Sequence, residues 1–98
     1  SKMSTKTQHG YIIFRQDSSG KLEVAKVGIS GGALNKNGTS RRANSQVNKF
    51  NREEGDWEYF AVVMPETMEG RAMALEWEKE LADQIRTIQK TMPKHSKP

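Results

Sequence analysis

The chain has 98 residues, no cysteine and a formal net charge of +4 at pH 7. This length suits one small domain with a single core, and the absence of cysteine excludes disulfides and thiolate zinc sites. No apolar run approaches the roughly 20 residues that cross a bilayer, and the first residues lack the apolar centre of a signal peptide. We therefore expect one soluble domain over residues 1–98, with loose termini at 1–9 and 92–98.

The charge is distributed unevenly along the chain. Residues 1–52 carry ten Lys or Arg against two acidic residues, giving +8, whereas residues 53–98 carry six against ten, giving −4. A basic surface attracts phosphate backbones through counterion release, which is typical of nucleic-acid binding. Charge of this size also serves solubility alone, so composition leaves both interpretations open.

The first predicted element is a β-hairpin. Two runs rich in β-branched and aromatic residues, 11–15 and 22–30, flank a polar turn that contains Asp, Ser and Gly. Symmetric pairing about that turn places Tyr11 opposite Lys26. Opposed residues share a face of the sheet, so we expect the Tyr11 phenol beside the Lys26 ammonium.

A loop and a helix follow the hairpin. Residues 31–38 are rich in Gly and Asn but lack both common phosphate-binding glycine spacings, so we interpret them as a connection. Thr39 and Ser40 are N-cap residues for a helix over 41–50. One arc of this helix faces the sheet, and it comprises Ala43, Val47 and Phe50.

The same helical wheel places three polar residues. Arg42 and Gln46 lie on the flank of the apolar arc, beside the core at the sheet edge, and Arg41 projects away into solvent. Arg42 is therefore the cation that the helix holds closest to the sheet.

The second half of the chain predicts a strand and a long helix. Residues 57–64 are apolar on both faces, which favours a central or covered strand ended by Pro65. Periodicity from Met68 to about Thr91 predicts the chief helix. Its apolar stripe comprises Ala74, Trp77, Leu81, Ile85 and Ile88. The tail over 90–98 is predicted to be basic and extended, with His95 exposed.

Glu78 falls inside the apolar arc of this long helix. A carboxylate that faces a core is costly unless a cation neutralises it, so Glu78 is half of a buried ion pair or a metal ligand. The elements together predict an α+β fold, an α/β-sandwich-like domain in which helices flank a small three-stranded antiparallel sheet.

Tyr11, Lys26, Arg42 and Glu78 are the side chain types that phosphodiester hydrolysis needs. The reaction requires a positioned water, a base for it, and positive charge for the developing phosphorane oxygens. One carboxylate suits a single metal whose other ligands are water and phosphate, which favours Mg²⁺ or Mn²⁺.

The order of these motifs resembles the GIY-YIG nuclease superfamily over roughly residues 10–90. Gly10-Tyr11-Ile12-Ile13 is similar to the first motif, and Lys26-Val27-Gly28-Ile29-Ser30 resembles the second with lysine in place of its tyrosine. Arg42 matches the helical arginine, with Gln46 where a histidine often stands, and Glu78-Lys79-Glu80-Leu81 resembles the motif of the metal-binding glutamate. The late asparagine of the family has no clear counterpart here.

The positions suggest a role for each residue. Tyr11, with its pKa lowered by Lys26, orients and deprotonates the attacking water, and Lys26 also touches the phosphate. Arg42 stabilises the pentavalent transition state, and Glu78 holds the metal that polarises the leaving 3′ oxygen. Substrate-binding residues of second rank are Ser30, Arg41, Gln46 and His95. The resemblance favours DNA over RNA as the substrate.

The segment from Lys26 through Asn48 further resembles small GIY-YIG-like domains at the C-termini of bacterial polymorphic toxins. This implies delivery into a target cell as part of a larger toxin, action in its cytoplasm, and an inhibiting immunity protein. Two other classes stay open. One is a non-catalytic nucleic-acid-binding module that stacks bases on Phe50, Trp57 or Tyr59, and the other is an interaction domain in which Glu78 belongs to an internal ion network.

Overall fold

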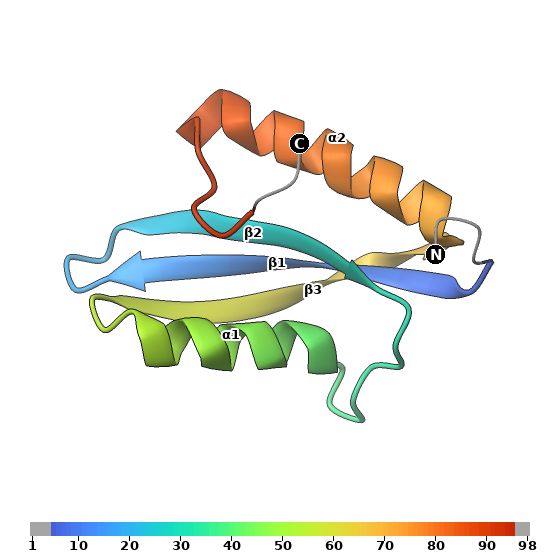
Figure 1. Ribbon diagram of the computed structural model, residues 1–98, viewed down its shortest axis with the longest axis horizontal. Coiled ribbons are helices and arrows are strands. Elements are labelled where there is room, and N and C mark those ends of the chain that lie inside the picture. The colour runs from blue at the N-terminus through green and yellow to red at the C-terminus, as the bar shows by residue number, and fades with distance from the viewer. Residues whose placement is uncertain (1–4, 96–98) are drawn as a thin grey trace.

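In a computed structural model, which describes residues 5–95, a three-stranded antiparallel sheet of order β2-β1-β3 carries one helix on each side (Figure 1). The elements in chain order are β1 Thr7–Asp17, β2 Leu22–Ser30, α1 Arg41–Glu53, β3 Trp57–Glu69 and α2 Arg71–Gln89. This confirms the predicted α+β class. Within the described residues, no helix is both long and apolar enough to cross a membrane.

The hairpin is confirmed, but its predicted register is wrong. Tyr11 lies opposite Gly28, and Lys26 lies opposite Ile13. The pairing then shifts between Ile13 and Phe14, because β2 contains one extra residue there. The error amounts to two residues, which preserves the face, so Lys26 stays on the Tyr11 side of the sheet as a diagonal neighbour.

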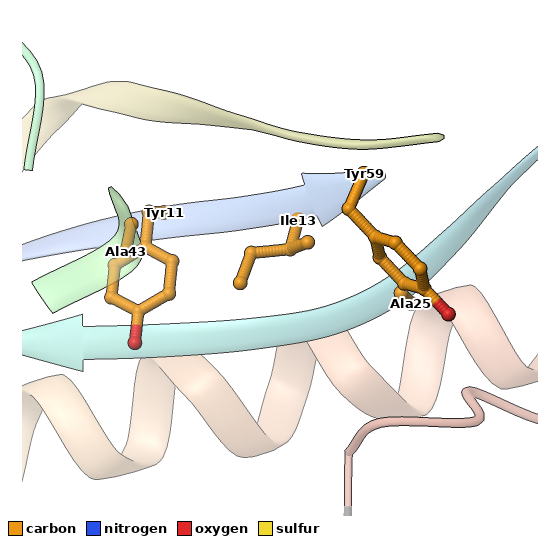
Figure 2. Packing of buried hydrophobic residues seen from close by; sticks show 5 residues of the cluster. All are labelled: Tyr11, Ile13, Ala25, Ala43 and Tyr59. Carbon is orange, nitrogen blue, oxygen red and sulfur yellow. The ribbon is translucent and has the colours of Figure 1, made fainter. Parts of the chain in front are cut away.

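Two apolar layers hold the sheet between the helices. On one face, Tyr11, Ile13 and Tyr59 pack with Ala25 and with Ala43 of α1 (Figure 2). Val47 and Phe50 also pack against this cluster, which confirms the predicted inner face of α1. On the other face, Val27 and Ile29 pack beneath the α2 residues Ala82 and Ala74.

The α1 boundaries follow from its capping chemistry. Ser40 is the N-cap, and its Oγ accepts the Ala43 N–H at 3.3 Å, as the sequence predicts. The helix continues three residues beyond the predicted end, to Glu53. The first turn of α1 therefore starts immediately after a buried serine at the rim of the sheet.

The predictions for β3 and for the start of α2 need correction. β3 is an edge strand and runs through Pro65 to Glu69. An edge position tolerates proline because one side of the strand has no ladder partner that needs its N–H. Met68 is consequently a strand residue, and α2 begins at Arg71 after Gly70, whose φ is 92°. Ile88, predicted on the inner stripe, is 85% exposed.

Parts of the two segments predicted to be loose are ordered instead. At the N-terminus, β1 begins at Thr7, and Gln8 and His9 are buried. At the other end, Met92 and His95 are buried against the sheet. The other residues predicted to be loose, 1–4 and 96–98, lie outside the described residues.

The last residue of α2 and the chain that follows it cover part of the open edge of β2. The Gln89 side chain accepts the Val24 N–H at 3.0 Å and donates to the Val24 carbonyl at 2.6 Å. The Lys94 N–H then donates to the Ala25 carbonyl at 2.9 Å. These contacts satisfy backbone groups that an edge strand would otherwise offer to another chain.

Candidate functional site

A basic cleft of about 700 Å³ opens between the loop after β2 and the first turns of α1. Its walls include His9, Ser30, Lys36, Arg41, Arg42 and Gln46. The three cations stand beside the N-terminal end of α1, where the helix dipole is positive. The basic cleft thus has the charge that attracts an anion.

Tyr11, on the central strand, lies behind the wall of this cleft and is linked to it through the lining residue Gln46. Its side chain is buried, and its hydroxyl donates to Gln46 Oε1 at 2.9 Å. The ring lies directly over Gly28, where an added Cβ would stand 2.1 Å from Cζ of the tyrosine. Figure 2 shows the hydroxyl pointing from β1 across β2. Only glycine at position 28 leaves room for this placement.

Burial raises the pKa of Tyr11, and the charge of Glu78 raises it further, while the charge and hydrogen bonding of Arg42 act in the opposite direction. The predicted lowering by Lys26 is therefore wrong, because Gly28 occupies the place opposite the phenol and desolvation is the largest influence. A neutral phenol that donates to Gln46 has two oxygen lone pairs, and the hydrogen bond from Arg42 occupies one of them. It can orient a water molecule by accepting a hydrogen bond.

Glu78 occupies the innermost line of α2. It stands one turn from Ala74 and one turn from Ala82, and all three are buried, with Glu78 only 4% exposed. This confirms that the carboxylate faces the sheet. Its charge acts on both Tyr11 and His95, so the phenol lies within electrostatic range of both the Glu78 carboxylate and Arg42.

The other predicted residues fall into two groups. Ser30, Arg41, Arg42 and Gln46 line the basic cleft together. Lys26 is half-buried on the same face as Tyr11, and its charge acts on His95.

His95 lies elsewhere and is not exposed as predicted. It is 7% exposed, and its Nδ1 lies 3.0 Å from the Val27 carbonyl oxygen. Burial lowers the pKa of His95. The sequence could not indicate this, because the contact joins a tail residue to a strand 68 positions earlier.

His9 is a cleft residue that the sequence analysis missed. It is buried, its Nε2 lies 2.8 Å from Ser40 Oγ, and its ring centroid is 6.4 Å from that of Tyr11. Burial lowers the pKa of His9, against a hydrogen bond with the Gly32 backbone. His9 therefore ties β1 to the loop after β2 and to the cap of α1. The sequence did carry a signal for this placement. His9 is two residues from Tyr11, and residues two apart in a strand lie on the same face.

Among residues 5–95, no group of three His, Cys, Asp or Glu side chains is arranged to hold a metal ion. The Glu78 carboxylate is one side chain of these types whose charge acts on the phenol, and the His9 ring lies near the same phenol. No family model, curated protein or solved structure matches the chain.

Proposed function

We propose that this protein is a metal-dependent endonuclease that hydrolyses phosphodiester bonds, with DNA as its substrate. The observation that carries the proposal is the environment of one hydroxyl group. Tyr11 donates to Gln46 in the wall of the basic cleft, and its phenol is influenced by Arg42 and by the inward carboxylate of Glu78. A buried phenol within range of a guanidinium and of a carboxylate suits the needs of phosphodiester hydrolysis.

The basic cleft supports a role in holding the phosphate. Arg41 and Arg42 supply guanidinium groups that suit phosphate oxygens, and Ser30 adds a hydroxyl. Tyr11 orients the attacking water through its oxygen, since its hydrogen is donated to Gln46. Arg42 neutralises charge that develops on the phosphorane, and Lys26 adds positive charge from the same face of the sheet.

The donor chemistry of Glu78 fits one divalent ion. A carboxylate is a hard oxygen ligand of the kind that Mg²⁺ and Mn²⁺ prefer, and these ions keep several water or phosphate ligands. Glu78 would hold the ion, and the bound ion would supply positive charge for the leaving 3′ oxygen.

The test is nicking of supercoiled plasmid by purified protein with Mg²⁺, with Mn²⁺ and with EDTA. We expect cleavage that EDTA abolishes and that falls at least about 10²-fold in Tyr11→Phe and Glu78→Gln. Tyr59→Phe, at another buried tyrosine, and Glu80→Gln, on the exposed face of α2, are matched controls that should keep wild-type activity. Cleavage that persists in both site variants, or with EDTA, contradicts the proposal.

The resemblance to toxin domains adds a proposed partner. An immunity protein that blocks this site would present an acidic surface to the basic cleft, since the cleft residues Lys36, Arg41 and Arg42 are cationic. The expected consequence is that charge reversal in the cleft weakens both inhibition and DNA binding.

A non-catalytic nucleic-acid-binding module is the second proposal, and the same cations favour it. The three aromatic residues expected to stack bases, however, are already in contact with cationic side chains or buried. Arg15 covers the Trp57 ring at 3.8 Å, Lys94 lies 5.3 Å from the Phe50 ring centroid, and Tyr59 is buried. This second function would rest on phosphate contacts alone, and it predicts DNA binding in EDTA with no nicking in any metal.

The third class is an interaction domain in which Glu78 belongs to an internal ion network. The thermal stability of a Glu78 variant distinguishes this class from a nuclease. If Glu78 serves only the fold, Glu78→Gln lowers the melting temperature and no activity exists to lose. If Glu78 serves catalysis, the variant stays folded and loses nicking. The melting temperature of Glu78→Gln, measured beside its activity, therefore distinguishes the two roles.

A further inference from the structure

A second pocket, of about 410 Å³, adjoins the basic cleft. It lies at the end of the sheet where β1 begins, and its walls include Lys6, Gln8, Leu34 and Thr67. His9 and residues 32–34 line both cavities. A chain bound in the cleft could therefore place a neighbouring group in the second pocket across this shared wall.

One residue in the wall of this pocket, Gln8, carries a buried hydrogen-bond acceptor. Gln8 is 3% exposed, and its Nε2 donates to the Lys6 carbonyl at 3.0 Å. The amide is held against Gly31, where an added Cβ would stand 2.7 Å from Nε2. Across residues 5–95, no donor reaches Gln8 Oε1. A buried carbonyl oxygen without a donor costs about 1–3 kcal/mol, so a ligand that supplies an N–H would recover that cost.

The walls of the pocket indicate the class of ligand. Leu34 is an exposed apolar side chain, and Thr67 and Ala33 also line the pocket, while Gln8 supplies the acceptor. Every nucleobase combines a flat apolar face with an N–H on its pairing edge. A paired base still presents amino N–H groups in the grooves of a duplex. It must leave the base stack, however, before its pairing edge can enter a pocket beside Gln8.

We propose that the second pocket receives one unpaired nucleobase of the strand whose phosphate lies in the basic cleft, with Gln8 Oε1 accepting a hydrogen bond from that base. This rests on the proposed function and narrows its substrate to nucleic acid with an unpaired nucleotide, such as a bulge or a single strand. The basic cleft supplies affinity for the nucleic-acid backbone, and the second pocket supplies the preference for an unpaired nucleotide.

The test is fluorescence anisotropy in EDTA with three labelled DNAs: a perfect duplex, the same duplex with one bulged nucleotide, and a single strand. The wild type should bind the bulged duplex about 3–10-fold more tightly than the perfect one, the value of one hydrogen bond. Gln8→Met removes the acceptor at similar length and should lose most of this preference while its affinity for the perfect duplex is kept. Gln16→Met, at an exposed glutamine of the same strand, should keep the preference.

Equal affinity of the wild type for the two duplexes overturns the proposal, and so does an equal loss of preference in Gln16→Met. If Gln8→Met does not fold, the wild-type comparison still decides, together with the side-chain amide NMR signals of Gln8. These signals should shift with the bulged duplex and not with the perfect one. If no DNA binds, the proposed function fails too, whereas binding and nicking without preference refute the base pocket alone.

Discussion

The position of the Tyr11 phenol depends on Gly28, so Gly28→Ala is the sharpest test of the site. The new Cβ would stand 2.1 Å from Cζ and 2.3 Å from Oη of Tyr11, whereas ordinary contact begins at 3.4 Å. The ring must therefore move by more than an ångström. It packs with Ala43 of α1, and its hydroxyl is bonded to Gln46, so the movement breaks contacts on the α1 side.

Overpacking of this kind costs about 1–3 kcal/mol. For a domain of this size, each kcal/mol lowers the melting temperature by about 4–8 °C. Displacing the phenol by about an ångström should also reduce nicking about 10²-fold, because catalysis depends on the position of the reacting groups. Gly28→Ala is thus expected to be folded, measurably less stable and nearly inactive.

The assay pairs calorimetric melting with plasmid nicking. Gly55→Ala is the matched control, since no atom lies within 4 Å of its added Cβ. In a Tyr11→Leu background the overlap disappears, so Gly28→Ala should cost much less stability there than in the wild type. A Gly28→Ala protein that melts and nicks like the wild type would refute the placement of the phenol over Gly28.

Three further predictions concern the metal, the pH and the sheet edge. Glu78→Gln should weaken Mn²⁺ binding at least about 10-fold by isothermal titration calorimetry, and unchanged binding would place the ion elsewhere. Burial lowers the pKa of His9 and His95 below 6.5, so the unfolded chain binds more protons in that range. The free energy of unfolding should therefore be highest above pH 6.5 and decrease below it. Urea titrations should find a smaller decrease in His9→Gln. Gln89→Leu should lower the free energy of unfolding by about 1–3 kcal/mol, and Gln84→Leu, on the exposed face of α2, should change it little.

Local chemistry was sufficient to predict the elements and part of the site. Ser40 caps α1 where its hydroxyl and the following apolar arc indicated. Glu78 faces the sheet as the helical wheel required, because the direction of a helical side chain follows from residue spacing alone. Arg42 and Gln46 line one cavity because both lie on the same flank of one helix.

The misses share a physical cause, which is contact between distant segments. The hairpin register depends on an extra residue in β2 that no pattern marks. β3 passes Pro65 because it is an edge strand, and strand order is a tertiary property. His95 is buried because the tail docks on β2, and His9 is buried because the cap of α1 lies against β1. Each of these features depends on which segments meet, and local sequence carries little information about that.

The arrangement of the proposed site also explains how a sheet with a helix on each face can bring residues of the two faces within electrostatic range of each other. Tyr11 belongs to the α1 face, and Glu78 projects from α2 on the other face. They influence each other because β2 is an edge strand and Gly28 offers no side chain there, so the phenol extends across the strand toward its rim (Figure 2). A larger residue at position 28, or another strand beyond β2, would separate the two groups. The glycine is therefore a requirement of the site rather than of the strand, because glycine in a strand interior costs stability.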